Sequence, residues 1–168
     1  MILPDLLVPN LKIVFCGTAA STVSARENAY YAKPSNYFWR TLHQINLTPY
    51  QFSPQEFNKL LDYGMGLTDI AKHSIGNDDV LAKSDFDAQD LEQKIQAHQP
   101  AILAFTSKRA ASEFFGKPTS KISYGLQDDK LGVTQFWVLS SPSGSARAYW
   151  DVSVWQALAD KVGKLSDS

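Results

Sequence analysis

The stretch LKIVFCGTAASTVSARENAYYAKPSNYFW, residues 11–39, contains the signals that decide the fold. Residues 11–16 form a short, mostly apolar run with β-forming residues at its centre, which predicts a buried strand. The run stops at Gly17, and the small residues 17–21 would let a ligand approach the backbone closely. Open α/β sheets place their sites at loops that leave the carboxyl ends of parallel strands. We therefore expect the functional site at this loop.

Apolar runs and helix signals alternate along the rest of the chain. Further buried strands are predicted at 101–106 and 135–139, with a brief extended piece at 66–70. Helices are predicted over residues 34–45, 53–64, 87–98, 107–116 and 149–162. This alternation predicts an α/β fold, a three-layer α/β/α single domain with a short, mostly parallel central sheet.

The remaining segments are expected to be irregular. We expect one domain over residues 1–168, with an irregular lead-in at 1–10 and a disordered tail at 163–168. Residues 74–83 are polar and lack periodicity, which predicts a mobile surface excursion.

The composition suits a single domain: 168 residues, 44% of them hydrophobic, can bury a full core. Sixteen basic and 17 acidic residues leave a formal net charge of −1, so any nucleic-acid surface must come from local segregation of charge. Acidic residues do gather between 78 and 92, while basic residues lie near predicted loops. A mixed, solvated surface explains this distribution equally well.

The residues that bind metals and form disulfides are sparse. Cys16 is the single cysteine, and it ends a predicted buried strand, so no disulfide is expected. The histidines at 43, 73 and 98 lie too far apart for a metal-binding helix, and we expect no metal. No export signal and no apolar run of roughly 20 residues is visible, so we expect a cytoplasmic protein with no membrane partner.

Two loops leave the carboxyl ends of predicted strands, at residues 17–21 and 140–147. Both would open on one edge of the sheet. Their small residues, backbone amides and one arginine could receive a phosphate backbone or a nucleotide. The alternative is that both loops are simply tight connections.

Four segments carry a family resemblance: VFCG at 14–17, YYAKPSNYFW at 30–39, LLDYGMGLTDIAK at 60–72 and SSPSGSARAYW at 140–150. Together they resemble the mismatch-specific branch of the uracil-DNA glycosylase superfamily, which includes the thymine-DNA glycosylases. The resemblance implies a domain that flips a damaged base out of DNA and hydrolyses its N-glycosidic bond without a metal or cofactor. It also implies duplex DNA containing uracil or a mismatched base as the partner. We expect a monomer.

The resemblance assigns site residues to two parts of the chain, residues 17–36 and residues 141–147. The base-binding candidates are Gly17, Thr18, Ala19, Tyr31 and Asn36. The DNA-binding candidates are Ser141, Ser143, Gly144, Ser145, Ala146 and Arg147. Tyr31 falls where the family places the aromatic ring that stacks on the base, although a core tyrosine is the alternative. Asn36 is expected mainly to form a hydrogen bond at a helix start. Because Ser145 replaces the bulky apolar wedge of the family, stack-filling is expected to depend on Arg147 or on backbone.

The first loop departs from the family pattern. Relatives carry an asparagine that holds the attacking water, and Ala19 stands at that position. Alanine cannot hold a water molecule, so another polar side chain must do so if the protein is an enzyme. Asp69 is the catalytic candidate, because a carboxylate can accept a proton from water and stabilise a cationic sugar. The alternative is that Asp69 caps a short helical turn over residues 70–72.

Three functions are consistent with the sequence. The leading hypothesis is a monofunctional glycosylase that removes uracil, mainly from G:U mismatches, with other deaminated bases as further substrates. The second is a non-catalytic DNA lesion-binding module of the same fold, which the missing asparagine favours. The third is a small-molecule binding protein that uses the first loop for a phosphate, although this loop lacks the glycine-rich nucleotide fingerprints.

Overall fold

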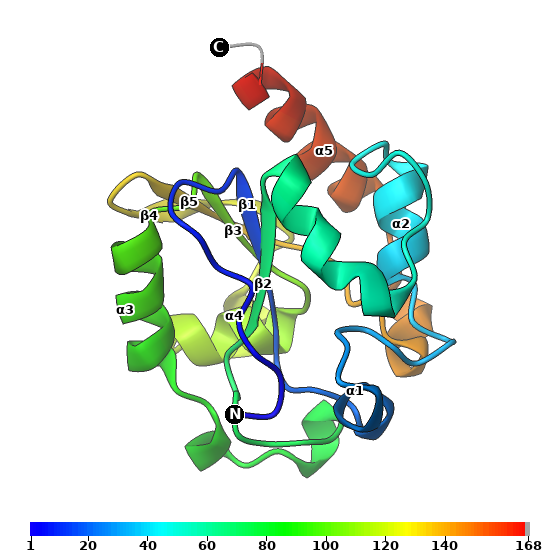
Figure 1. Cartoon of the computed structure of the whole chain (residues 1–168). Helices are drawn as coiled ribbons and strands as arrows, with labels where there is room; N and C mark the ends of the chain where they lie inside the picture. The colour runs from blue at the N-terminus through cyan, green and yellow to red at the C-terminus, as the bar shows by residue number, and fades with distance from the viewer. Residues whose placement is uncertain (167–168) are drawn as a thin grey trace.

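The structure, a computed structural model, describes residues 1–166 and is built on a five-stranded sheet (Figure 1). The strand order is β2-β1-β3-β5-β4. The strands are β1 (Ile13–Gly17), β2 (Met65–Asp69), β3 (Ile102–Phe105), β4 (Gly125–Leu131) and β5 (Thr134–Val138). All neighbouring strands pair in parallel except β4, which pairs antiparallel with β5. The carboxyl ends of β1, β2, β3 and β5 therefore meet at one edge.

Helices of two kinds connect the strands. The α-helices are α1 (Thr22–Glu27), α2 (Phe38–Gln44), α3 (Ala88–His98), α4 (Lys108–Phe115) and α5 (Val152–Ser166). The 3₁₀ helices are η1 (Pro54–Tyr63), η2 (Asp78–Val80), η3 (Lys83–Asp85), η4 (Thr119–Lys121) and η5 (Gly144–Tyr149).

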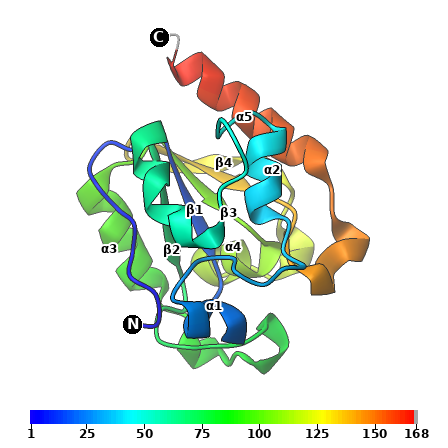
Figure 2. The ribbon, with the colours of Figure 1, turned by 45° about the vertical axis from the view of Figure 1, so that its right-hand side comes forward.

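The sheet separates two hydrophobic clusters, because successive side chains of a strand point to opposite faces. Ile13 and Phe15 of β1 pack with α2, η1 and α5, and Phe15 lies edge-on to Phe38 with ring centroids 5.2 Å apart. Val14 and Cys16 pack on the other face with α3 and α4. Figure 1 and Figure 2 show α2 and α5 together on one side of the sheet and α3 on the other. The predicted three-layer α/β/α fold is confirmed.

Helix boundaries follow the capping signals in the sequence. Ser107 accepts a hydrogen bond from the amide of Ala110 at the start of α4, and Gly116 ends that helix in the left-handed conformation at φ 67°. Asp87 caps α3 in the same way through the amide of Asp90. Gly64, at φ 76°, ends η1 as predicted.

Four parts of the predicted fold need correction. The antiparallel strand β4 and the short helix α1 were not expected. The last helix begins at Val152 rather than at residue 149, because residues 144–149 form the separate helix η5. Helix α5 extends to Ser166, so residues 163–166 are not the disordered tail that we expected, and residues 167–168 lie outside the described part of the chain.

Two irregular segments form backbone hydrogen bonds, one with the outer strand β2 and the other with the loop that follows β1. The lead-in pairs with β2 through the amide of Leu6, which donates to the carbonyl of Leu67 at 2.9 Å, and the amide of Leu67 donates back at 3.0 Å. The excursion at 74–83 pairs with the first loop through an Ala20–Ile75 bridge, and the Gly76 amide donates to the Ala20 carbonyl at 3.0 Å. The excursion is therefore attached to the loop that we expect to carry the site.

Candidate active site

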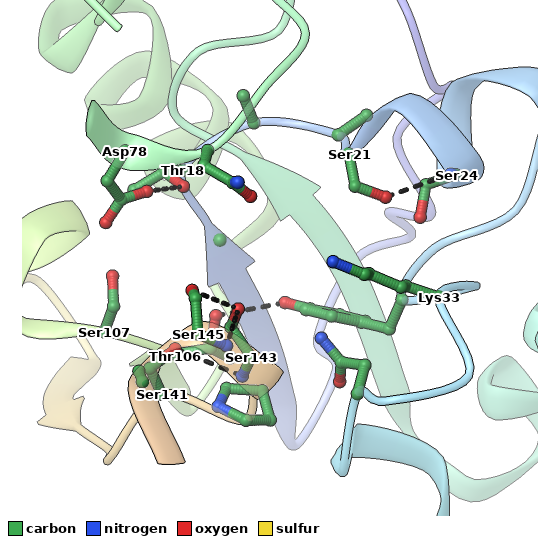
Figure 3. A pocket seen from close by; sticks show the side chains of 18 of the residues that line it. Thr18, Ser21, Ser24, Lys33, Asp78, Thr106, Ser107, Ser141, Ser143 and Ser145 are labelled. Atoms are coloured by element: carbon green, nitrogen blue, oxygen red, sulfur yellow. Dashed lines mark hydrogen bonds between the residues drawn. The ribbon is translucent and has the colours of Figure 1, made fainter. Parts of the chain in front are cut away.

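A cavity of about 440 Å³ opens at the carboxyl edge of the sheet (Figure 3). Its volume lies within the range of about 300–1,000 Å³ that is typical of small-molecule sites. Every predicted site residue except Arg147 lines it: Gly17, Thr18, Ala19, Tyr31, Asn36, Asp69, Ser141, Ser143, Gly144, Ser145 and Ala146. The two loops singled out in the sequence therefore form opposite parts of one cavity.

Asp69, the last residue of β2, places a buried carboxylate in the cavity wall. The residue is only 6% exposed, and its carboxylate accepts no hydrogen bond from the described residues. Burial raises the pKa of Asp69 from 3.8 to about 6, an effect that Lys72 and Lys94 oppose and Asp5 reinforces. A carboxylate with a pKa close to neutrality suits a general base.

The alternative role of Asp69 as a helix cap does not fit the structure. Residues 70–72 do not form a helix. The amides that follow Asp69 donate instead to the first loop: Ile70 to the Gly17 carbonyl at 2.9 Å, and Ala71 to the Thr18 carbonyl at 2.7 Å. These bonds hold the end of β2 against the first loop and leave the carboxylate of Asp69 without a capping role.

Three side chains converge on the backbone of Gly17. A Cβ atom at this position would lie 2.8 Å from Asp69 Oδ1, 3.2 Å from the Tyr31 hydroxyl and 3.5 Å from Thr106 Oγ1. The first of these distances is shorter than real Cβ contacts, so a side chain here would displace the carboxylate. The absence of a side chain at Gly17 thus lets the Asp69 carboxylate approach the backbone of β1.

A buried charge cluster lies behind Asp69. Lys72 Nζ is 3.0 Å from Asp5 Oδ1, and Lys94 Nζ is 2.8 Å from Asp5 Oδ2. Lys72 also donates to the Tyr30 hydroxyl at 3.0 Å, and Thr68 Oγ1 donates to Asp5 at 2.7 Å. Despite its burial, these partners hold the pKa of Asp5 below its ordinary value. The cluster places fixed charges of both signs close to Asp69.

Tyr31 is anchored as a flat wall of the cavity. Its ring stacks on Phe38 with centroids 4.0 Å apart and planes inclined by 17°, and its hydroxyl lies 3.1 Å from Thr106 Oγ1. Its backbone adopts the left-handed region at φ 52°, which is uncommon for a residue other than glycine. Phe38 covers one face of the ring, so a base in the cavity would meet the other face.

The excursion supplies a wall of the cavity that the sequence did not predict. Gly76, Asn77, Asp78 and Asp79 all line the cavity. Thr18 Oγ1 donates to Asp78 Oδ1 at 2.7 Å, which joins the excursion to the first loop (Figure 3). Thr106 and Ser107 were also missed, although the rule that sites follow parallel strands applies to them as well.

Asn36 lies at the cavity wall, just before the N-cap residue of helix α2, Tyr37. Its side-chain oxygen accepts a hydrogen bond from the amide of Phe38 at 2.9 Å, as expected for a residue at a helix start. Because that oxygen is already bound, the side-chain NH₂ group is the part of Asn36 that remains to contact a ligand.

Arg147 lies against the protein surface beside the cavity. Its guanidinium group is 4.2 Å from the centroid of the Tyr37 ring and donates to the Ser35 carbonyl at 2.9 Å. Arg40 lies 3.9 Å from the centroid of the same ring. Two guanidinium groups are therefore gathered on one aromatic ring, an arrangement suited to phosphate binding.

The described residues provide no cluster of metal ligands. Within residues 1–166, no group of three or more histidine, cysteine, aspartate or glutamate side chains could hold a metal ion. Over the same range, none of the helices is both long and apolar enough to cross a membrane.

The fold and the cavity together define a class of protein. A three-layer α/β/α domain with a cavity at the carboxyl ends of its strands, lined by a tyrosine ring and a buried carboxylate, is consistent with a DNA glycosylase, which must hold an extruded base. The chain belongs to the uracil DNA glycosylase superfamily, whose family model matches residues 4–159.

A solved structure shows the same fold. The chain is similar to a protein from Methanosarcina acetivorans, named as a candidate uracil DNA glycosylase, whose structure was determined by NMR in solution. The two share 21% sequence identity over 96% of each chain, with a TM-score of 0.62. At this identity the likeness shows a shared fold.

Proposed function

We propose that this protein is a monofunctional DNA glycosylase that removes uracil, mainly from G:U mismatches, and leaves an abasic site. One observation carries the proposal: Asp69 is a buried carboxylate without a hydrogen-bond partner among the described residues, in the wall of a cavity that also contains a stacking tyrosine. Membership of the superfamily supports DNA as the substrate. The mismatch-specific branch, a monomeric state and a cytoplasmic location are parts of this proposal.

In the proposed reaction, Asp69 activates the attacking water. The water oxygen forms a bond to C1′ of the extruded nucleotide, and Asp69 accepts a water proton. The bond between C1′ and the base nitrogen breaks, and its electron pair leaves with the base. Ionised Asp69 also stabilises the positive charge that develops on the sugar, and Tyr31 holds the base by stacking.

The water is expected near Gly17, because Asp69 Oδ1 approaches the backbone there. Ala19 also lines the cavity, but its methyl group cannot form a hydrogen bond to the water. Asp69 therefore takes over the function of the asparagine that relatives carry at the position of Ala19.

The alternative is a lesion-binding module without catalytic activity, and Ala19 is the observation that favours it. Such a protein would use the same cavity to capture an extruded base. It would bind a uracil-containing duplex more tightly than an undamaged one, but it would never break the N-glycosidic bond.

Single-turnover cleavage of labelled duplexes tests the proposal. The substrates contain uracil opposite guanine, uracil opposite adenine, thymine opposite guanine, or another deaminated base. Strand breaks that appear only after alkaline treatment would support a monofunctional glycosylase, and the fastest substrate would identify the preferred lesion. Selective binding without cleavage of any substrate would instead establish the lesion-binding module.

A further inference from the structure

Tyr149 is an aromatic residue exposed beside the cavity. It is 75% exposed, more than any other large hydrophobic or aromatic side chain in residues 1–164. Tyr149 ends η5, the helix whose first residues, Gly144 to Ala146, line the cavity. An aromatic ring with this exposure leaves a large apolar area in water unless a partner covers it.

The segment that carries Tyr149 is held firmly at its base. Trp150, the next residue, packs edge-on against Tyr37 with ring centroids 5.3 Å apart and against Trp155 at 5.7 Å. Ser140 Oγ donates to the Asp151 carbonyl at 2.8 Å and accepts from the Asp151 amide at 3.2 Å. These bonds close the segment 140–151, so Tyr149 projects from a fixed base.

The other side chains of this segment are poorly suited to enter a base stack. Ser145 is small, and its hydroxyl lies 2.9 Å from that of Ser143. Arg147 is held by Tyr37 and by the carbonyl of Ser35. Tyr149 is large and exposed, and no hydrogen bond or ring contact to a described residue holds its side chain.

Positive groups lie beside this segment. Arg40 and Arg147 both lie on the ring of Tyr37, which Trp150 contacts. A duplex whose phosphates bind these cations would lie against the segment that carries Tyr149.

We propose that Tyr149 inserts into the base stack of duplex DNA and fills the gap left by the extruded nucleotide. This inference rests on the proposed function, because a gap forms only when a base is flipped. The partner is the pair of bases that flank the lesion, and the ring stacks on their faces. The free energy of this stacking offsets part of the cost of extrusion.

Two substrates separate stack-filling from other roles. The first is a duplex with a single G:U mismatch, and the second has the same arms but places the uracil at the centre of an unpaired bubble, where no continuous stack has to be repaired. Tyr149→Ala should lower single-turnover cleavage of the mismatched duplex by about 5- to 150-fold, as expected for the loss of one stacking contact. Cleavage of the bubble should change less than about three-fold, because no continuous stack has to be repaired there.

Matched variants control the comparison. Tyr149→Phe and Tyr149→Leu should retain most duplex activity, because both keep a bulky apolar side chain. Tyr63→Ala removes another exposed tyrosine, 42% exposed at the end of η1, on the opposite edge of the sheet from the cavity, and should match the wild type on both substrates. The melting temperature of each variant shows whether it is folded.

Each outcome decides the proposal. Selective loss of duplex cleavage in Tyr149→Ala, with recovery in the phenylalanine and leucine variants, supports insertion. Equal activity of Tyr149→Ala and wild type on the duplex overturns it, and so does an equal loss on both substrates, which would indicate a role in binding the base itself. If the wild type cleaves neither substrate, the proposed glycosylase function fails.

Discussion

Replacing Asp69 by asparagine should change activity and stability in opposite directions. The substitution keeps the shape of the side chain but removes its charge and its ability to accept a proton. General bases contribute about 100- to 10,000-fold to rate. Asp69→Asn should therefore lower single-turnover cleavage of a uracil-containing duplex by at least two orders of magnitude.

The effect on stability follows from the raised pKa of Asp69. A carboxyl group whose pKa rises on folding stabilises the protein only while it is protonated, so this contribution is lost as pH rises from about 4 to about 6. The rise from 3.8 to about 6, at about 1.36 kcal/mol per unit, corresponds to about 3 kcal/mol above pH 6. Asparagine avoids this cost, but burying its NH₂ group without a hydrogen-bond partner costs about 1–2 kcal/mol. The net gain in the free energy of unfolding above pH 6 is therefore about 1–2 kcal/mol.

The net result is a stabilised, inactive variant. At pH 8 the gain of about 1–2 kcal/mol should raise the melting temperature by about 2–8 °C. The gain should vanish near pH 5 and become a loss near pH 4, because the cost of burying the charge disappears there while the cost of the asparagine NH₂ group remains. Thermal melts at several pH values, with cleavage measured on the same samples, test both effects. Undiminished cleavage by Asp69→Asn would refute the role as base, and a lower melting temperature at pH 8 would refute the assignment of Asp69 as an unpaired buried charge.

Three further perturbations test the rest of the site. Tyr31→Ala should lower cleavage by about 5- to 150-fold through the loss of stacking worth roughly 1–3 kcal/mol, whereas Tyr31→Phe should keep most activity; equal rates for the alanine variant and wild type would reject stacking. Binding to duplex DNA should weaken between about 50 and 200 mM salt, and Arg147→Ala should lower both the affinity and its salt dependence; salt-independent binding would argue against a phosphate-contacting surface. Lys72→Met removes a positive charge that lowers the pKa of Asp69, so the pH of half-maximal cleavage should rise by about one unit, while Lys59→Met, at an exposed ion pair, should leave it unchanged. A rate loss in Lys72→Met that is equal at every pH would indicate a purely structural lysine.

Local patterns were sufficient to predict the layers of the fold and the edge that carries the site. The apolar run at 11–16 identified the central strand β1, and Gly17 marked its end, because glycine is needed where Asp69 approaches the backbone. The strand-end rule also predicted that the loop at 140–147 lies at the same edge as the first loop, and residues 141–146 do line the same cavity. Asp69, in contrast, was singled out through the family resemblance.

Features set by contacts distant in sequence were missed. Strand β4 has the polar sequence GLQDDKL and lies at the sheet edge, where charged residues are common and the alternation of apolar residues is lost. Asp78 reaches the cavity through a hydrogen bond to Thr18, 60 residues earlier, and nothing in the local sequence encodes that pairing. The excursion therefore resembled a mobile surface loop.

Side-chain conformation lay outside what a one-dimensional pattern can predict. Arg147 was expected to help fill the base stack, but its guanidinium lies on Tyr37, more than a hundred residues away. No sequence pattern marked Tyr149, because the exposure of its side chain depends on the three-dimensional fold.

The cavity draws its lining from Leu3 to Ala146, nearly the whole length of the chain. During synthesis the N-terminal segments emerge first, yet the wall formed by residues 141–146 is added only after most of the protein has left the ribosome. The pairing of β1 with both β2 and β3 also joins distant parts of the sequence, which makes such sheets slow to assemble. A truncated or partly folded chain therefore lacks a complete pocket.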